Sequence, residues 1–407
     1  MNNVDKQYLD LAREIIENGS YKETRSGGVY SVFGRQMRFD LKEGFPILTT
    51  KKVFTKGVIH ELLWFLKSDT NIKYLVDNNV HIWDDDAYRY YLELIKKHNE
   101  LIDYKTNLIL NKKTYCFYYD TFNVSNKIDD SKMFITLGDN LDIHIDDFGN
   151  TLDKIEPLSK EEFLDSVKKN KYITLISYFD NYSCGFYLND YTYGNLGKIY
   201  GEQWRKQGEK QIDQIQSIIE MLKTNPDDRR MLCMAWNANE LDEMALPPCH
   251  YGFQVYTREL TIIERLDWLC GHSNGEYDEW KSVSDELLDE LNVPKRELSL
   301  MWMQRSVDFG LGLPFNIASY SILLSLLAQC VNMTVGEVIC SLGDVHIYDA
   351  HIDGIKEQLT RDYHKFNLPK LELNKNITNI DDFKFEDIKI IGYESYPPIK
   401  LPLSVGL

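Results

Sequence analysis

Two consecutive prolines fix the backbone directly in front of a cysteine–histidine pair. Residues 244–250 read Met-Ala-Leu-Pro-Pro-Cys-His, so Pro247 and Pro248 precede Cys249. Each proline holds φ near about −65° and has no backbone N–H, which excludes a helix interior or a central strand at this point. The sequence therefore predicts that Cys249 is presented on a stiff turn beside the imidazole of His250.

The thiol of Cys249 has two interpretations. Free cysteine is among the most buried residue types, so Cys249 taken alone is best explained as a small core residue. A neighbouring His⁺ or arginine, however, lowers the pKa of a thiol, and the thiolate is the nucleophile that enzymes use. The polar residues elsewhere in the chain decide between the two, because a nucleophile needs partners that a core residue does not.

Composition limits the setting and the partners of the chain. The 407 residues carry a formal net charge of −17 and seven cysteines. The negative charge argues against a broad nucleic-acid surface, and few cysteines in odd number argue against a disulfide framework. The sequence shows no signal peptide and no run of 18 apolar residues that would span a membrane. We therefore expect a cytoplasmic protein with free thiols, in the host cytoplasm if a virus or phage encodes it.

Local patterns predict an α+β chain with two insertions. Helical spacing occurs at 7–17, 57–66, 211–222 and 317–331, and strand-like runs occur at 29–34, 36–39, 231–236 and 298–303. We expect 1–86 and 194–407 to form one catalytic domain. Residues 87–193 carry their own periodicity, with strand-like runs at 115–119, 133–145 and 172–178 and a capping box at Ser159 that opens a helix to Lys169. We interpret 87–193 as an inserted α+β subdomain, and 258–295, with helices near 261–269 and 284–291, as a smaller helical insertion.

Several polar side chains on separate elements have both a functional and an ordinary interpretation. Arg25 lies in a glycine-rich turn that would suit a phosphate, although an arginine beside a turn is usually only solvated. Arg229 and Arg230 follow an acidic turn, either as a solvated patch or as a phosphate-binding fork aimed at a partner subunit. Glu61 interrupts a nearly all-apolar helix, where a carboxylate is either a solvated edge residue or a buried group with a shifted pKa.

Taken together, these residues predict a site for a nucleoside monophosphate that is attacked covalently. Arginines beside Cys249 would lower the pKa of its thiol and bind a phosphate. The amide of Asn316 can both donate to and accept from the edge of a pyrimidine. The full set of polar residues behind this prediction is Cys249, Arg25, Arg229, Arg230, Arg305, Glu61, Asn316, His346 and Tyr348.

At these residues the chain resembles the folate-dependent, dimeric thymidylate synthase family. The matching stretches follow one another in order and are 25–39, 45–51, 57–83, 196–204, 227–237, 244–254, 304–320, 343–348 and 383–400. The resemblance implies an α+β fold with a mixed twisted sheet and helices, and a homodimer joined sheet to sheet. It implies transfer and reduction of a one-carbon unit from the cosubstrate 5,10-methylenetetrahydrofolate to C5 of dUMP, which gives dTMP and dihydrofolate through a Cys249 adduct. No metal is expected, since no Cys-x-x-Cys or His-Glu-x-x-His spacing occurs.

The resemblance also implies a role for each matching residue. Cys249 would add to C6 of dUMP, with Arg305 near the thiol and the phosphate, and Glu61 would organise proton transfers through water. The residues expected near Glu61 are Tyr200, Gln203 and His250. The remaining nucleotide contacts would be Arg25 and Ser306 at the phosphate, Arg229 and Arg230 at the phosphate of the other subunit, Gln304, Asn316 at the uracil edge, and His346 and Tyr348 at the ribose. The folate contacts would be Lys51 at the anionic tail, Ile82, Trp83, Asp308, which is also counted as catalytic, Leu311, Gly312 and Phe315.

Three other functions stay open at this point. Phage dUMP hydroxymethylases share the scaffold, and by the family pattern the C-terminal tail at 401–407 is about two residues longer than usual. A tail that shields the site poorly would admit water in place of hydride, giving 5-hydroxymethyl-dUMP and tetrahydrofolate. A papain-like hydrolase would also use cysteine and histidine, but without the arginines. A binding protein that has lost its activity is the third, and the retained Cys249, Glu61, Arg305 and Asn316 argue against it.

Overall fold

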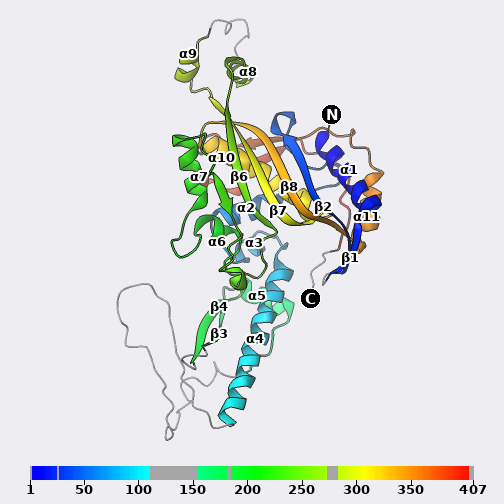
Figure 1. Ribbon diagram of the computed structural model, residues 1–407, viewed down its shortest axis with the longest axis vertical. Coiled ribbons are helices and arrows are strands. Elements are labelled where there is room, and N and C mark those ends of the chain that lie inside the picture. Colours follow the sequence, from blue (N-terminus) through cyan, green and yellow to red (C-terminus); the bar gives the residue numbers. More distant parts are fainter. Residues whose placement is uncertain (1, 25–26, 111–153, 181–184, 273–282, 403–407) are drawn as a thin grey trace, which may run out of the picture. The chain divides into compact units, whose positions relative to one another are not determined.

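In the computed structural model, a six-stranded mixed sheet forms the frame of the fold (Figure 1). Strands β7 and β8 run parallel, and all other neighbours are antiparallel. A parallel pair needs a crossover connection, and here the helix α10 (Gly312–Cys330) supplies it between β7 and β8. The α+β class and the mixed sheet are therefore confirmed. The strands lie in the order β1 (Ser20–Thr24), β2 (Gly27–Asp40), β8 (Thr334–Tyr348), β7 (Arg296–Asp308), β6 (His250–Glu259) and β5 (Leu232–Met234).

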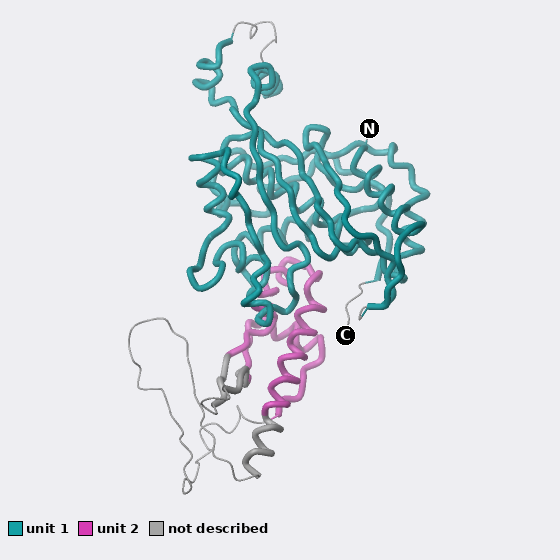
Figure 2. Tube along the Cα trace, in the orientation of Figure 1, with its two compact units in different colours: residues 1–70, 198–407 teal, residues 71–197 magenta. Residues whose placement is uncertain are grey.

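The structure describes residues 2–24, 27–110, 154–180, 185–272 and 283–402. They divide into two units, residues 1–70 with 198–407 and residues 71–197 (Figure 2). The expected strands at 115–119 and 133–145 lie outside the described residues. The domain boundaries predicted at 87 and 193 stay predictions, and the two units are described separately below.

Helix α10 is the core helix of the first unit and packs against β7, β8 and α2 (Thr55–Leu66). Every residue from Asn316 to Ala328 is buried. By length and composition alone it could cross a membrane, but 83% of its most apolar window is buried inside the fold. The helix begins at Gly312, earlier than the predicted 317, because Pro314 falls in the first turn, where its missing N–H breaks no helical bond.

The other elements of the first unit flank the sheet or extend from it. Helix α2 is buried from Gly57 through Leu66, which agrees with the apolar run at 57–66. The helices that flank the sheet are α1 (Asn3–Asn18), α2 (Thr55–Leu66), α6 (Tyr200–Arg205), α7 (Gln214–Thr224) and α11 (Ile352–Leu359). Strands β9 (Lys370–Leu373) and β10 (Ile388–Ile391) pair separately, and 3₁₀ turns lie at Leu41–Glu43, Leu241–Glu243, Asp349–His351, Ile380–Asp382 and Phe385–Asp387.

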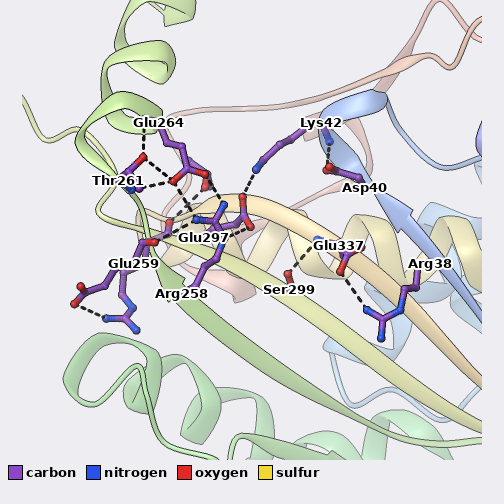
Figure 3. Close-up of polar contacts among 12 residues, drawn as sticks. Arg38, Asp40, Lys42, Arg258, Glu259, Thr261, Glu264, Glu297, Ser299 and Glu337 are labelled. Carbon is purple, nitrogen blue, oxygen red and sulfur yellow. Dashed lines mark hydrogen bonds and ion pairs between the residues drawn. The ribbon is translucent and has the colours of Figure 1, made fainter. Parts of the chain in front are cut away.

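A helical hairpin stands between β6 and β7. It consists of α8 (Ile262–His272) and α9 (Asp285–Glu290), which enclose a small core of Leu269, Leu288 and Val293. Its base is tied to the sheet by charged groups (Figure 3). Arg258 pairs with Glu264 at 2.6 Å and with Glu297 at 2.9 Å, and Lys42 also pairs with Glu297. These ion pairs lie at the end of the sheet opposite to Cys249.

The second unit has its own helices, strands and aromatic core. Helix α5 (Lys160–Lys168) begins at the predicted Ser159 capping box, in which Ser159 and Glu162 bond each other's backbone. The rings of Tyr91 and Phe163 lie 5.1 Å apart in its core. The other elements are α3 (Lys73–Asp77), α4 (Asp84–Leu110), β3 (Tyr172–Asp180) and β4 (Gly185–Thr192), and the two strands pair antiparallel.

Candidate active site

Cys249 lies on the irregular turn that enters β6, as the two prolines predict. Its side chain is half-buried, while Pro248 beneath it is buried. The backbone N–H of Cys249 donates to the hydroxyl of Tyr200 at 2.8 Å, and its carbonyl accepts from the N–H of Arg305 at 2.8 Å. The nucleophile candidate is thus fixed through its own backbone before any substrate binds.

Arg305 holds the same turn with its guanidinium. Nε donates to the carbonyl of Pro248 at 3.0 Å, and Nη2 donates to that of Pro247 at 2.9 Å. The guanidinium carbon also lies 5.3 Å from the centre of the Trp236 ring, a cation–π distance. A permanent cation is therefore held beside Cys249, which favours the thiolate.

Three other cysteines show what a structural thiol is like in this fold. Cys233 and Cys340 are fully buried, and burial raises the pKa of each thiol well above its usual value. Burial also raises the pKa of Cys330 to about 11. All five cysteines within the described ranges are free thiols. Exposure alone does not distinguish Cys249 from the other cysteines, since Cys270 on the hairpin is also half-buried. The turn and the arginine beside it do.

His250 is not the cation that activates the thiol. Its ring is buried, stacks on Tyr200 at 4.2 Å, and shares a 2.8 Å hydrogen bond between Nδ1 and the Tyr320 hydroxyl. Burial lowers the pKa of His250 to about 3, so the imidazole is neutral at pH 7. The sequence suggested a histidine or an arginine as the cation beside Cys249. In the structure Arg305 is that cation, and His250 is not.

Glu61 is buried on helix α2, with 8% of its surface exposed. This selects the buried alternative over the solvated one. Burial raises the pKa of Tyr200 and Tyr320 well above 10, and the charge of Glu61 adds to the shift at both hydroxyls. The carboxylate and the two neutral phenols therefore share one environment with the Cys249 turn, as acid–base groups must.

The ends of β7 and β8 bring the predicted nucleotide contacts to the same end of the sheet. Gln304 pairs across the sheet with His250, and its side-chain oxygen accepts from Asn316 Nδ2 at 3.0 Å. Along β7, Asp308 pairs with His346 of β8. The rings of His346 and Tyr348 lie 5.1 Å apart, edge to face. Ser306 lies between Gln304 and Asp308 on β7 and pairs with Asp344.

The predicted folate contacts of the first unit form the turn between β7 and α10. Oδ1 of Asp308 accepts from the N–H groups of Gly310 and Leu311 at 2.9 and 3.1 Å. The ammonium of Lys51 is buried and donates to the carbonyl of Gly310, and burial lowers its pKa to about 8. Lys51 therefore supports this turn from within. Leu311, Gly312 and Phe315 lie at the start of α10 and are half-buried.

Other predicted residues lie away from Cys249 in this chain or outside its described part. Arg229 and Arg230 are exposed on the turn before β5. The N–H of Val255 donates to the carbonyl of Met231, so this turn lies level with the middle of β6. At about 3.3 Å per residue, roughly 20 Å of strand separates it from Cys249. Arg25 lies outside the described residues, and Ile82 and Trp83 belong to the second unit.

Some residues of the site were not singled out in the sequence. Tyr320 lies one helical turn after Asn316 on α10, so helical spacing would have placed both on one face. Trp236 carries no local signal for its position under Arg305. Tyr8 donates from its hydroxyl to the Phe309 carbonyl at 2.8 Å, a contact made by the first helix that only the fold reveals. Among the described side chains, no three of His, Cys, Asp and Glu lie together as a metal site requires.

One thiol, a fixed arginine, an amide pair and a His-x-Tyr pair lie at one end of a mixed sheet, an arrangement that suits an enzyme with a cysteine nucleophile. Comparison with known proteins gives the family. The thymidylate synthase family matches residues 6–405. The chain is 40% identical over 401 residues to the thymidylate synthase of Mycoplasma mobile, and 39% identical over 405 residues to that of Listeria monocytogenes strain HCC23. Each match covers 98% of this chain and 100% of the relative. The chain belongs to the thymidylate synthase family.

Proposed function

We propose that this chain is a thymidylate synthase that methylates dUMP at C5, with 5,10-methylenetetrahydrofolate as the source of the one-carbon unit. The observation that carries the proposal is the tie between Arg305 and the Pro247–Cys249 turn, which fixes a cation and a thiol together. The family match and the names of the relatives support the same reaction.

Nucleophilic attack by Cys249 is the first step of the proposed reaction. The thiolate adds to C6 of the uracil ring, which makes C5 nucleophilic, and its later expulsion releases the product. Arg305 stabilises the thiolate, while Tyr200 holds the backbone N–H of the nucleophile. The buried Glu61, acting through water, would move protons to and from the ring near Tyr200 and Tyr320.

Nucleotide recognition is assigned to the ends of β7 and β8 and to Asn316 in the first turns of α10. The amide of Asn316 is oriented by Gln304, whose own oxygen also accepts from Trp302 Nε1 at 3.2 Å. An oriented amide can match both a donor and an acceptor of uracil, so it favours dUMP over dCMP. His346 and Tyr348 would hold the ribose, and Ser306 and Arg305 the phosphate.

The turn between β7 and α10 fits the folate cosubstrate. A half-buried carboxylate, Asp308, lies in the same turn as the half-buried Leu311 and near Phe315, a combination that suits a flat heterocycle with N–H donors. Bound there, the folate supplies the one-carbon unit and the hydride. The residues of this chain orient it and exclude water.

We also propose that the enzyme is a homodimer whose site is shared. Arg229 and Arg230 are exposed, and roughly 20 Å of strand separates their level from Cys249 within one chain. Their arginine pair would reach the phosphate bound to the other copy. Residues 1–86 and 194–407 would then form the catalytic domain of each cytoplasmic subunit, with 87–193 and 258–295 as insertions.

A turnover assay with dUMP and 5,10-methylenetetrahydrofolate tests the proposal. We expect dihydrofolate, followed by its absorbance, and dTMP, identified by mass, in equal amounts. The Cys249→Ser variant should form neither. A hydroxymethylated nucleotide with tetrahydrofolate would instead identify a hydroxymethylase. Absence of both nucleotide products from the protein with Cys249 intact would overturn the proposed function.

A further inference from the structure

The segment 393–402, here called the C-terminal strap, is tied to the loop that precedes α2. The hydroxyl of Tyr393 donates to the carbonyl of Leu48 at 2.7 Å, and the N–H of Tyr396 donates to that of Thr49 at 2.8 Å. Arg361, just after α11, donates to the carbonyls of both Thr50 and Pro397. These bonds hold the first half of the strap against the loop that carries Lys51.

A histidine holds the other end of the strap. The ring of His351 is completely buried, and its Nε2 lies 2.7 Å from the carbonyl oxygen of Pro402. A carbonyl oxygen can only accept, so Nε2 carries the proton and donates. The side chain of Leu401 packs beside the same ring, because a Cβ built on Gly310 would lie 2.6 Å from His351 Nδ1 and 3.0 Å from Leu401 Cδ1.

The opposite edge of the imidazole faces the turn that holds Asp308. Nδ1 of His351 lies 3.8 Å from Oδ1 of Asp308 and has no hydrogen-bond partner among the described residues. That same Oδ1 accepts from the N–H groups of Gly310 and Leu311. One side of the ring therefore binds the strap, and the other side backs the carboxylate turn.

Small residues make this packing possible. Any side chain at Gly310 would collide with the ring of His351. Gly354 on α11 plays the same part for the strap, since a Cβ there would lie 2.6 Å from Leu401 Cδ2 and 2.9 Å from Ile399 Cγ2. The strap, the imidazole and the turn are thus in contact without intervening side chains, and a shift in one is transmitted to the others.

We propose that His351 is a positioning residue that couples the seating of the C-terminal strap to the Asp308 turn. It acts by donating from Nε2 to the Pro402 carbonyl while its ring backs the turn. The consequence for catalysis rests on the proposed function, in which Asp308 contacts the folate. The ring of Tyr348, which would hold the ribose, lies 5.4 Å from that of His351, edge to face. The imidazole backs the Asp308 turn itself, so we expect the KM for the folate to change more than the KM for dUMP.

Three variants separate this role from simple core packing. In His351→Gln the amide nitrogen replaces Nε2 as a donor to Pro402, whereas His351→Leu keeps a side chain of similar bulk without a donor. His364→Leu is the matched control, because His364 is exposed on the loop after α11. Amide hydrogen exchange over 393–402 measures the seating of the strap without any substrate. Steady-state kinetics then give KM for the folate and for dUMP separately.

We expect His351→Leu to speed exchange in the strap about tenfold, as loss of one buried hydrogen bond predicts, with α10 unchanged. The same variant should raise KM for the folate about tenfold and leave KM for dUMP within about twofold. His351→Gln should recover most of both effects. Unchanged exchange in the strap, equal changes in both KM values, or no recovery with glutamine would each overturn the proposal. Absence of turnover by the wild type would instead reject the proposed function, and the exchange measurement would still decide whether His351 holds the strap.

Discussion

The backbone N–H of Cys249 donates to the phenolic oxygen of Tyr200 at 2.8 Å, and Tyr200 is buried at the start of α6. Burial, followed by the charges of Cys249 and Glu61, raises the pKa of this phenol well above 10, so it is neutral at pH 7. A neutral, buried oxygen therefore fixes the backbone of the proposed nucleophile. It does so from a helix that follows the second unit in sequence.

Replacing Tyr200 by phenylalanine should damage catalysis more than folding. The change removes the acceptor of the Cys249 N–H, which should cost about 1–3 kcal/mol of unfolding free energy. Because the nucleophile also loses its alignment, we expect kcat to fall about a hundredfold. Tyr320→Phe is the control, since it removes a buried hydroxyl bonded to His250 rather than to Cys249. Urea unfolding and turnover measure the two effects, and equal kcat in both variants would contradict the role of Tyr200.

Local sequence predicted the elements better than it predicted their contacts. The Pro247–Pro248 pair did place Cys249 on a turn, and the apolar run at 317–331 did form the core helix. The pairing of β7 with β8 could not be predicted, because parallel register depends on how α10 packs rather than on either strand alone. The convergence of Asp308 and His346 follows from that register.

Charge states were the least predictable part of the site. His250 adjoins Cys249 in sequence, yet burial keeps the imidazole neutral. The residue next to Cys249 in sequence therefore does not supply a positive charge to its thiol. Lys51 was expected at an anionic ligand, and the structure places its ammonium in the core against Gly310. Glu61 left two possibilities open, and burial of all of α2 after Gly57 decides between them. Each outcome depends on desolvation by distant segments, which no local pattern reports.

The arginine pair should act in trans. Cys249→Ser and the double variant Arg229→Ala, Arg230→Ala should each be inactive alone. After unfolding and refolding together in equal amounts, half of the dimers are mixed, and each mixed dimer has one intact site. We therefore expect about a quarter of the wild-type activity. The control is to mix the two folded variants without unfolding them. If subunits exchange slowly, this mixture should show no activity at first. No recovery after refolding would reject a shared site.

Stability should fall on mild acidification because of His250. Its folded pKa of about 3 lies below the unfolded value of about 6.5, so the unfolded chain binds the proton first. The contribution of the neutral ring is complete above about pH 6.5 and declines as the pH falls toward 3. Between pH 7 and pH 5 this amounts to about 2 kcal/mol.

Comparing urea unfolding of the wild type and His250→Gln at both pH values isolates this contribution. The glutamine variant will be less stable at pH 7, but it should lose about 2 kcal/mol less than the wild type between pH 7 and pH 5. His364→Gln changes an exposed histidine and should lose as much stability between pH 7 and pH 5 as the wild type does. Identical pH dependence in His250→Gln and the wild type would show that folding does not lower the pKa of His250.

Substitution of Asn316 by aspartate should change the preferred base. The carboxylate has no N–H, so it loses the donor that Asn316 offers and gains an acceptor that suits the amino group of cytosine. We expect kcat/KM for dUMP to fall about a hundredfold, because uracil would leave a polar group of the site unmatched. Methylation of dCMP should become measurable. Gln304 should oppose the change, because its oxygen faces residue 316 and its amide nitrogen donates to Ser306 at 3.1 Å. The variant should therefore also lose about 1–3 kcal/mol of unfolding free energy.

Asn316→Ala is the matched control, since it removes the donor without adding an acceptor and should accept neither base well. If aspartate and alanine gave the same ratio of dCMP to dUMP turnover, Asn316 would not be the residue that reads the base.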